Sequence, residues 1–198
     1  MKKISTVLAI NISKEAKDQR PVEVIAYGLE IILNLGTQLA VLSILSYLLG
    51  IFPTVMISVI VAVIFRTFSG GTHLSSFSSC TMVSLISFIS IGYMAAKIAI
   101  NTEVLMALYL INFLLLAKWA PYSPKRKYSK NKRRAIKQIC IALLLVAFCT
   151  SFYLPIQEPY IIALALGLTW QTISITPWGV NLIAKADNLL KERGEKNV

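Results

Sequence analysis

Six long apolar stretches dominate this 198-residue sequence and limit what it can fold into. A helix that crosses a membrane needs about 20 mostly apolar residues, and only short connections separate the stretches. Charged residues make up 15% of the chain, against about 25% in an ordinary soluble domain. We therefore predict an all-α integral membrane protein with one membrane-embedded domain over residues 1–198. The stretches are 24–49, 54–68, 81–100, 104–120, 139–154 and 160–178.

The number of true spans is open at this point. Six spans follow from hydropathy, and four full spans with re-entrant or interfacial segments are the alternative. The N-terminal segment, 1–22, has apolar residues at helical spacing among lysines, which is typical of a helix lying in the membrane interface; a disordered tail is the alternative. A secretory signal peptide is not expected, because Asn11 and Ser13 interrupt the short apolar run.

Lysine and arginine fall almost entirely in alternate connections. The N-terminal segment, the stretch 66–80, the loop 121–138 and the polar tail 181–198 together hold 18 of the 20 basic residues. Basic connections face the cytoplasm, so both termini, the stretch 66–80 and the basic loop are expected there. Attraction to an anionic inner leaflet explains the net charge of +11, and no nucleic-acid partner is needed.

Residues 66–80, RTFSGGTHLSSFSSC, interrupt the apolar pattern with the only histidine, His73, and one of three cysteines, Cys80. A free thiol has a pKa of about 8.5. A nearby imidazole can take its proton and stabilise the thiolate, so a Cys and a His together are suited to acyl transfer. We predict a water-accessible pocket here, between the second and third helices.

The spacing of the pair sets a geometric condition. Positions seven apart on a straight helix are separated by roughly 10 Å, whereas proton transfer needs about 3 Å. The segment must therefore bend, and Gly70 and Gly71 make a bend possible. A Cys and a His can instead be simple packing residues. Cys140 and Cys149, in the fifth stretch, are expected to be buried structural thiols.

Arg66, Gly70–Gly71, His73 and Cys80 form the pattern R-x3-G-G-x-H-x6-C, between apolar spans and ahead of a basic loop. This resembles the accessory gene regulator B (AgrB) family of bacteria over essentially the whole chain. The resemblance implies a membrane cysteine endopeptidase of quorum sensing, acting without metal or cofactor on an AgrD-like propeptide. It also suggests a homodimer.

In the mechanism that the resemblance implies, Cys80 attacks a peptide carbonyl of the propeptide, with His73 as general base. The acidic C-terminal tail leaves, and a thiol or hydroxyl of the bound peptide closes a thiolactone or lactone ring from the thioester. No third, histidine-orienting residue can be named from the sequence.

Arg66 and the basic run have two interpretations each. Arg66 can bind the substrate or pair with an acid such as Glu30, and the pairing is favoured. Gly71 is expected to permit the bend. The basic run can be a solvated loop at anionic lipid or can attract the acidic tail of the propeptide. Its seven basic residues are Lys125, Arg126, Lys127, Lys130, Lys132, Arg133 and Arg134.

Two functions of other classes remain open in the sequence. The stretch 66–80 can be a re-entrant pathway of a small peptide transporter or exporter without proteolytic activity. The chain can also be a degenerate scaffold protein, although the intact His73 and Cys80 pair argues against that.

Overall fold

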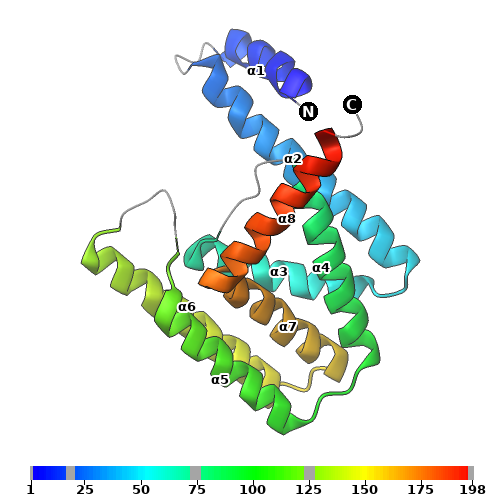
Figure 1. Cartoon of the computed structure of the whole chain (residues 1–198), viewed down its shortest axis with the longest axis vertical. Helices are drawn as coiled ribbons and strands as arrows, with labels where there is room; N and C mark the ends of the chain where they lie inside the picture. The colour runs from blue at the N-terminus through cyan, green and yellow to red at the C-terminus, as the bar shows by residue number, and fades with distance from the viewer. Residues whose placement is uncertain (1, 17–20, 72–76, 123–127, 196–198) are drawn as a thin grey trace. The chain divides into compact units, whose positions relative to one another are not determined.

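A computed structural model describes residues 2–16, 21–71, 77–122 and 128–195 (Figure 1). Nearly all of the described chain is helical, in agreement with the predicted fold class. The helices are α1 (Lys2–Ala16), α2 (Val22–Leu48), α3 (Phe52–Ser69), α4 (Phe77–Lys97), α5 (Thr102–Trp119), α6 (Lys130–Tyr153), α7 (Glu158–Ser174) and α8 (Pro177–Glu195).

The chain divides into two compact units, Met1–Leu45 and Ser46–Val198, with the boundary inside α2. In the first unit, the N-terminal segment forms helix α1 rather than a tail without structure, and it exposes apolar side chains such as Ile4 and Val7. Its place in the membrane interface stays a prediction, as does the single domain over 1–198.

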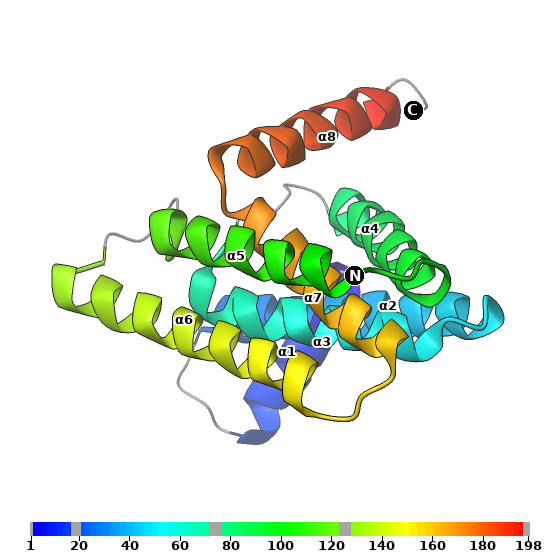
Figure 2. The same ribbon diagram turned by 90° about the horizontal axis from the view of Figure 1, so that it is seen from below.

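Helix α7 is the centre of the second unit. It packs most extensively on α3 and also contacts α4, α5, α6 and α8. Figure 2 shows α5 and α6 side by side, next to α3 and α7. Phe65 of α3, Leu116 of α5, Leu144 of α6 and Leu168 of α7 are buried in one apolar cluster that holds these four helices together.

Small residues let the helices approach α3 closely. A Cβ added at Gly167 of α7 would lie 2.6 Å from the Ser58 carbonyl oxygen of α3, and one at Gly92 of α4 would lie 2.3 Å from a Val55 methyl carbon. The Thr54 hydroxyl donates to the Gly92 carbonyl at 3.0 Å across the second contact. Such close backbone approach is typical of helix pairs in membranes, where apolar burial alone gives little driving force.

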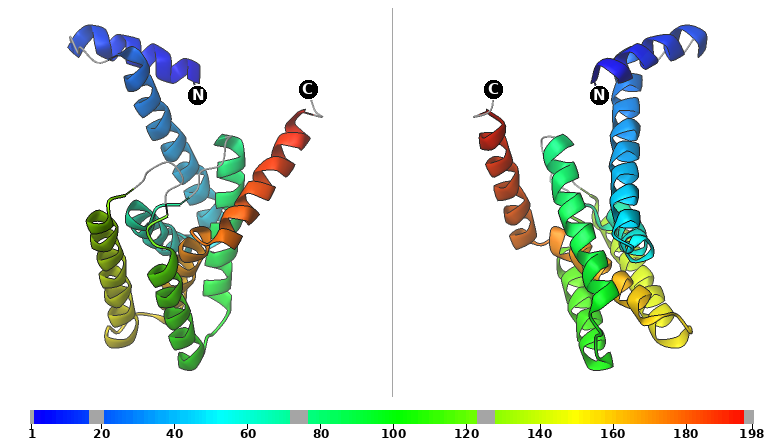
Figure 3. Two further views of the ribbon diagram at one scale, coloured as in Figure 1. Left: turned by 60° about the vertical axis from the view of Figure 1, so that its left-hand side comes forward. Right: turned by 90° about the vertical axis from the view of Figure 1, so that its right-hand side faces the viewer.

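Five helices among the described residues, α2 to α6, are long and apolar enough to span a membrane, and α7 with the start of α8 is a sixth if that bent pair is one span. The protein is therefore a multi-pass membrane protein. The predicted sixth span is not straight: α8 leaves α7 at 86° (Figure 3). Pro177 and the Thr176 hydroxyl, which accepts from the Gly179 N–H at 3.1 Å, start the new helix there.

Helices extend into two of the predicted polar segments. The basic loop 121–138 was expected to be a connection, but α6 begins at Lys130, where Ser129 caps it by accepting from the Lys132 N–H. The polar tail 181–198 was expected beyond the last helix, but α8 continues to Glu195. Lysine and arginine mark loops in membrane topology, yet they are also good helix formers, so charge alone did not locate these helix ends.

Candidate functional site

Cys80 is the fourth residue of α4 and is half-buried, with a free thiol. The first turn of a helix has backbone N–H groups without intrahelical acceptors, and its dipole favours a negative charge. His73 lies outside the described residues, so its pairing with Cys80 stays a prediction. Helix α3 ends at Ser69 and α4 begins at Phe77. The stretch 66–80 is therefore not one continuous helix. A break of this kind is what the predicted pairing of His73 with Cys80 requires.

Gly70 ends α3 in a conformation that only glycine adopts easily. Its φ is 80°, and its N–H donates to the Arg66 carbonyl at 3.0 Å. The Tyr122 N–H donates to the Ser69 carbonyl at 2.8 Å, which ties the turn to the segment after α5. A Cβ on Gly70 would lie 2.0 Å from the Tyr122 carbonyl oxygen. The sequence predicted a bend at this glycine, but it gave no indication of the contact with Tyr122.

Arg66, in the last turn of α3, brings positive charge to the site. Its guanidinium interacts electrostatically with Cys80. It also lies over Gly71, since a Cβ added there would be 3.5 Å from Arg66 Cζ. The predicted pairing of Arg66 with Glu30 remains untested, because Glu30 belongs to the other compact unit.

Gln171 of α7 is a site residue that sequence reasoning missed. Its side chain is 2% exposed, and its Nε2 donates to Ser69 Oγ at 3.0 Å and to the Gly70 carbonyl at 2.9 Å. The signal available in the sequence was a carboxamide inside an apolar segment, since buried polar side chains in membrane helices usually have a specific partner.

A second polar group lies deeper between α5 and α7. Asn112 donates to Thr169 Oγ1 at 2.9 Å, and its carbonyl oxygen accepts from the Thr172 hydroxyl. These bonds satisfy polar atoms that lipid could not solvate. They join two helices and do not involve the Gly70 turn.

The basic residues of the predicted binding run fall in two places. Lys125, Arg126 and Lys127 lie outside the described residues. The others, Lys130, Lys132, Arg133 and Arg134, are exposed on the first turns of α6. An open depression of about 370 Å³ is lined by Lys130, Arg133, Arg134 and Lys137.

The two other cysteines differ from each other. Cys140 is fully buried, as predicted, but Cys149 is exposed on α6, so the prediction of a buried thiol there is wrong. Nine residues along an α-helix turn the chain through two and a half turns. The two thiols therefore lie on opposite faces of α6, and only one can face the core.

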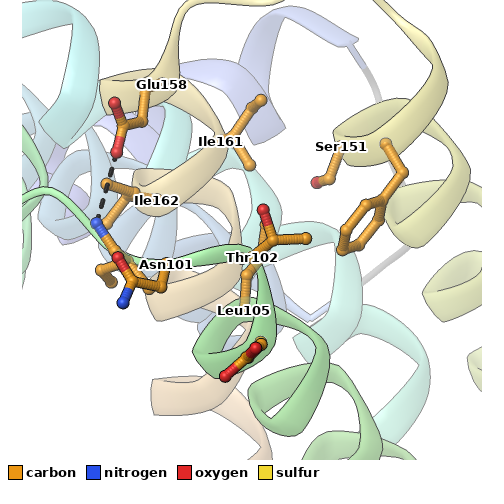
Figure 4. A pocket seen from close by; sticks show the side chains of 10 residues that line it. Asn101, Thr102, Leu105, Ser151, Glu158, Ile161 and Ile162 are labelled. Carbon is orange, nitrogen blue, oxygen red and sulfur yellow. Dashed lines mark hydrogen bonds between the residues drawn. The ribbon is translucent and has the colours of Figure 1, made fainter.

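An open pocket of about 740 Å³ is lined by residues of α5, α6 and α7 (Figure 4). It is formed where α5 begins, α6 ends and α7 begins, and Glu103 and Glu158 are among its lining residues. Glu158 Oε1 accepts from the Ile100 N–H at 3.3 Å. Helix α4 runs from Cys80 toward this end, and its 21 residues extend roughly 30 Å. The cavity is therefore separate from the Cys80 site.

In the part of the chain that the structure describes, no group of three or more His, Cys, Asp or Glu side chains could hold a metal ion.

The model of the family Accessory gene regulator B (AgrB) matches residues 1–175. The chain belongs to the AgrB family. It is 24% identical to "Putative AgrB-like protein 2" of Clostridium perfringens strain 13, over 93% of this chain and 95% of that protein. It is 29% identical to "Accessory gene regulator protein B" of Staphylococcus aureus strain MRSA252, over 73% of this chain and 76% of that protein. No solved structure matches the chain.

The range that matches the AgrB family model contains every residue of the R-x3-G-G-x-H-x6-C pattern, and it also contains Gln171. AgrB membership supports a role in accessory gene regulation, the signalling system for which the family is named.

Proposed function

We propose that this AgrB protein is a membrane-embedded cysteine endopeptidase with Cys80 as nucleophile and His73 as general base. The observation that carries the proposal is the thiol of Cys80 in the first turn of α4, half-buried and in electrostatic interaction with the Arg66 guanidinium. Cys140 lacks access to a substrate, because it is fully buried.

The reaction we propose begins with transfer of the thiol proton of Cys80 to His73. The thiolate then attacks a peptide carbonyl of an AgrD-like precursor, a C–S bond forms and the C–N bond breaks. His73 returns the proton to the leaving amine, so the C-terminal tail departs and a thioester remains on Cys80. A thiol or hydroxyl within the bound peptide attacks the thioester, closes the thiolactone or lactone ring and frees Cys80. Exclusion of water at the membrane boundary favours this ring closure over hydrolysis.

We also propose that the basic start of α6 attracts the acidic tail of the precursor. Lys130, Arg133 and Arg134 are exposed and line one depression, which suits an anionic partner. Anionic lipid headgroups of the inner leaflet are the competing partner for the same side chains. Binding in detergent, where no lipid bilayer is present, distinguishes the two partners. If the acidic tail binds these side chains, removal of their charge weakens precursor binding in detergent; if only lipid binds them, precursor binding is unchanged.

Substitution of the proposed nucleophile and base gives the direct test. Cys80→Ser and His73→Ala are expected to reduce precursor cleavage by at least about a thousandfold, because each removes a group needed in every turnover. Cys149→Ala, which changes an exposed thiol on α6, is the matched control and keeps wild-type cleavage. The measurement uses purified protein, a synthetic AgrD-like precursor peptide, and mass spectrometry of the products.

The same experiment detects the intermediate. Wild-type protein is expected to carry an adduct on Cys80 equal in mass to the released N-terminal fragment less one water, as a thioester requires. Cleavage that persists in Cys80→Ala would refute the mechanism. Peptide flux into vesicles without any cleavage would favour the exporter instead.

A further inference from the structure

The Gly70 turn is held in place from α7 by one side chain. We propose that Gln171 is a positioning residue of the Cys80 site, which fixes the turn at the end of α3 and thereby the Arg66 side chain. The proposal rests on the proposed function, because it assigns Gln171 to the same reaction. Gln171 does not contact the thiol itself, so its effect passes through the turn.

The orientation of the Gln171 carboxamide follows from its partners. The Gly70 carbonyl can only accept a hydrogen bond, so the nitrogen of Gln171 must face it. The second hydrogen of the same nitrogen is directed to Ser69 Oγ, and the two distances are 2.9 and 3.0 Å. One amide group therefore binds two consecutive residues of the turn. A shorter or an apolar side chain at position 171 would bind neither of them.

These bonds satisfy groups that helix α3 leaves without partners. The last carbonyls of a helix have no intrahelical donor, and Ser69 is fully buried, away from water. The Tyr122 N–H satisfies the Ser69 carbonyl and Gln171 satisfies the Gly70 carbonyl. The turn is thereby fixed to both α7 and the segment that follows α5. Without Gln171 the half-buried Gly70 carbonyl would lose this donor, and we expect the turn to move.

Displacement of this turn would reach the thiol through Arg66. The Gly70 N–H donates to the Arg66 carbonyl, and the Arg66 guanidinium lies over Gly71 and interacts with Cys80. A shift of the turn therefore changes the charge near the sulfur. Charge stabilisation of a nucleophile is sensitive to distance, so we expect reactivity to fall while substrate affinity is kept.

Thiol reactivity can be measured without any substrate. Purified protein is treated with iodoacetamide at pH 7, and modification of Cys80 is followed by peptide mass mapping. The exposed Cys149 in the same sample is the internal control. Gln171→Met, which keeps the volume but not the donors, is expected to slow Cys80 modification about threefold to tenfold and to leave Cys149 unchanged. Gln171→Glu, which keeps the length and loses both donors, replaces it if the Met variant does not fold.

Thr172→Val is the matched structural control. Thr172 is also fully buried on α7 and bonds to Asn112 of α5, but it makes no bond to the Gly70 turn. Its loss is expected to lower the thermal midpoint as much as the Gln171 variants while Cys80 modification stays within about twofold of wild type. Equal slowing in both variants, or no slowing in either Gln171 variant, overturns the proposal.

Cleavage kinetics separate this inference from the proposed function. With the precursor peptide as substrate, Gln171→Met is expected to lower kcat about tenfold and to keep KM within about twofold, as for a group that acts on the reacting centre alone. A raised KM with unchanged kcat overturns the inference. If wild-type protein does not cleave the precursor at all, the peptidase proposal fails, while the iodoacetamide comparison still decides whether Gln171 positions Cys80.

Discussion

At the scale of single residues, Gly70 and Gly71 have different reasons to be glycine. Gly70 needs a φ of 80°, and a Cβ there would meet the Tyr122 carbonyl oxygen. Gly71 has a φ of 151°, also unfavourable for other residues, but a Cβ would only make ordinary contact with the Arg66 guanidinium. The turn is thus constrained by packing at the first glycine and by backbone conformation at both.

This difference predicts unequal effects of the two alanine substitutions. Gly70→Ala is expected to destabilise the protein by about 2 kcal/mol or more, because strain and overlap with backbone add together. Gly71→Ala, with strain alone, is expected to cost about 1 kcal/mol. Thermal unfolding in detergent measures both, with Gly36→Ala as the control, because a Cβ at Gly36 meets nothing within 4 Å. Equal losses at Gly70 and Gly71 would mean that the contact with Tyr122 is not what constrains the turn.

The sequence predicted the parts of the site that are local in the chain. The glycine pair predicts a bend, and the polar run before an apolar stretch places Cys80 near a helix start; both features depend on neighbouring residues only. Gln171 is about a hundred positions away from the residues it binds, so no spacing rule could bring it to the site. Cys149 was misjudged because an apolar helix gives little indication of which face is buried.

At the scale of helices, close packing against α3 depends on small residues of its two neighbours. Gly167 of α7 meets the Ser58 backbone, and Gly92 of α4 meets Val55. Hydropathy located α3, α4 and α7 to within a few residues, because the length and apolar content of a helix can be read from its own segment of the sequence. Which helices pack closely is a property of pairs, and single glycines in apolar runs did not reveal it.

Enlarging Gly167 is expected to separate α7 from α3. The backbone oxygen and Cα of Ser58 lie 2.6 and 2.8 Å from the added Cβ, so neither helix can yield by rotating a side chain. We expect Gly167→Ala to destabilise the protein by about 1–3 kcal/mol, seen as a lower thermal midpoint in detergent. Gly28→Ala adds the same methyl group to α2 in open space and is expected to leave the midpoint unchanged or slightly raised. A Gly167→Ala protein as stable as wild type would contradict the close α3–α7 contact.

At the scale of the whole molecule, the connections of the second unit gather at two chemically different ends. The Gly70 turn, the segment around Tyr122 and the basic start of α6 belong to one end, joined by the bond between Ser69 and Tyr122. Ile100 and Glu158 meet at the other end, beside Glu103. Sequence charge predicted this division, because it follows from counting residues between spans. It could not predict the bend between α7 and α8, since the apolar run continues through it.

This division of charge predicts the orientation in the membrane. Basic connections are retained in the cytoplasm, so the end with Cys80 and Lys130 is expected inside and the end with Glu103 outside. In a variant without native cysteines, Glu103→Cys should react with a membrane-impermeant maleimide on intact cells, whereas Lys130→Cys should react only after permeabilisation. Both positions are exposed in the structure, so access depends on the membrane. Reversed labelling would contradict the orientation, and with it access of a cytosolic precursor to Cys80; labelling of both in intact cells would contradict the separation of the two ends by α5.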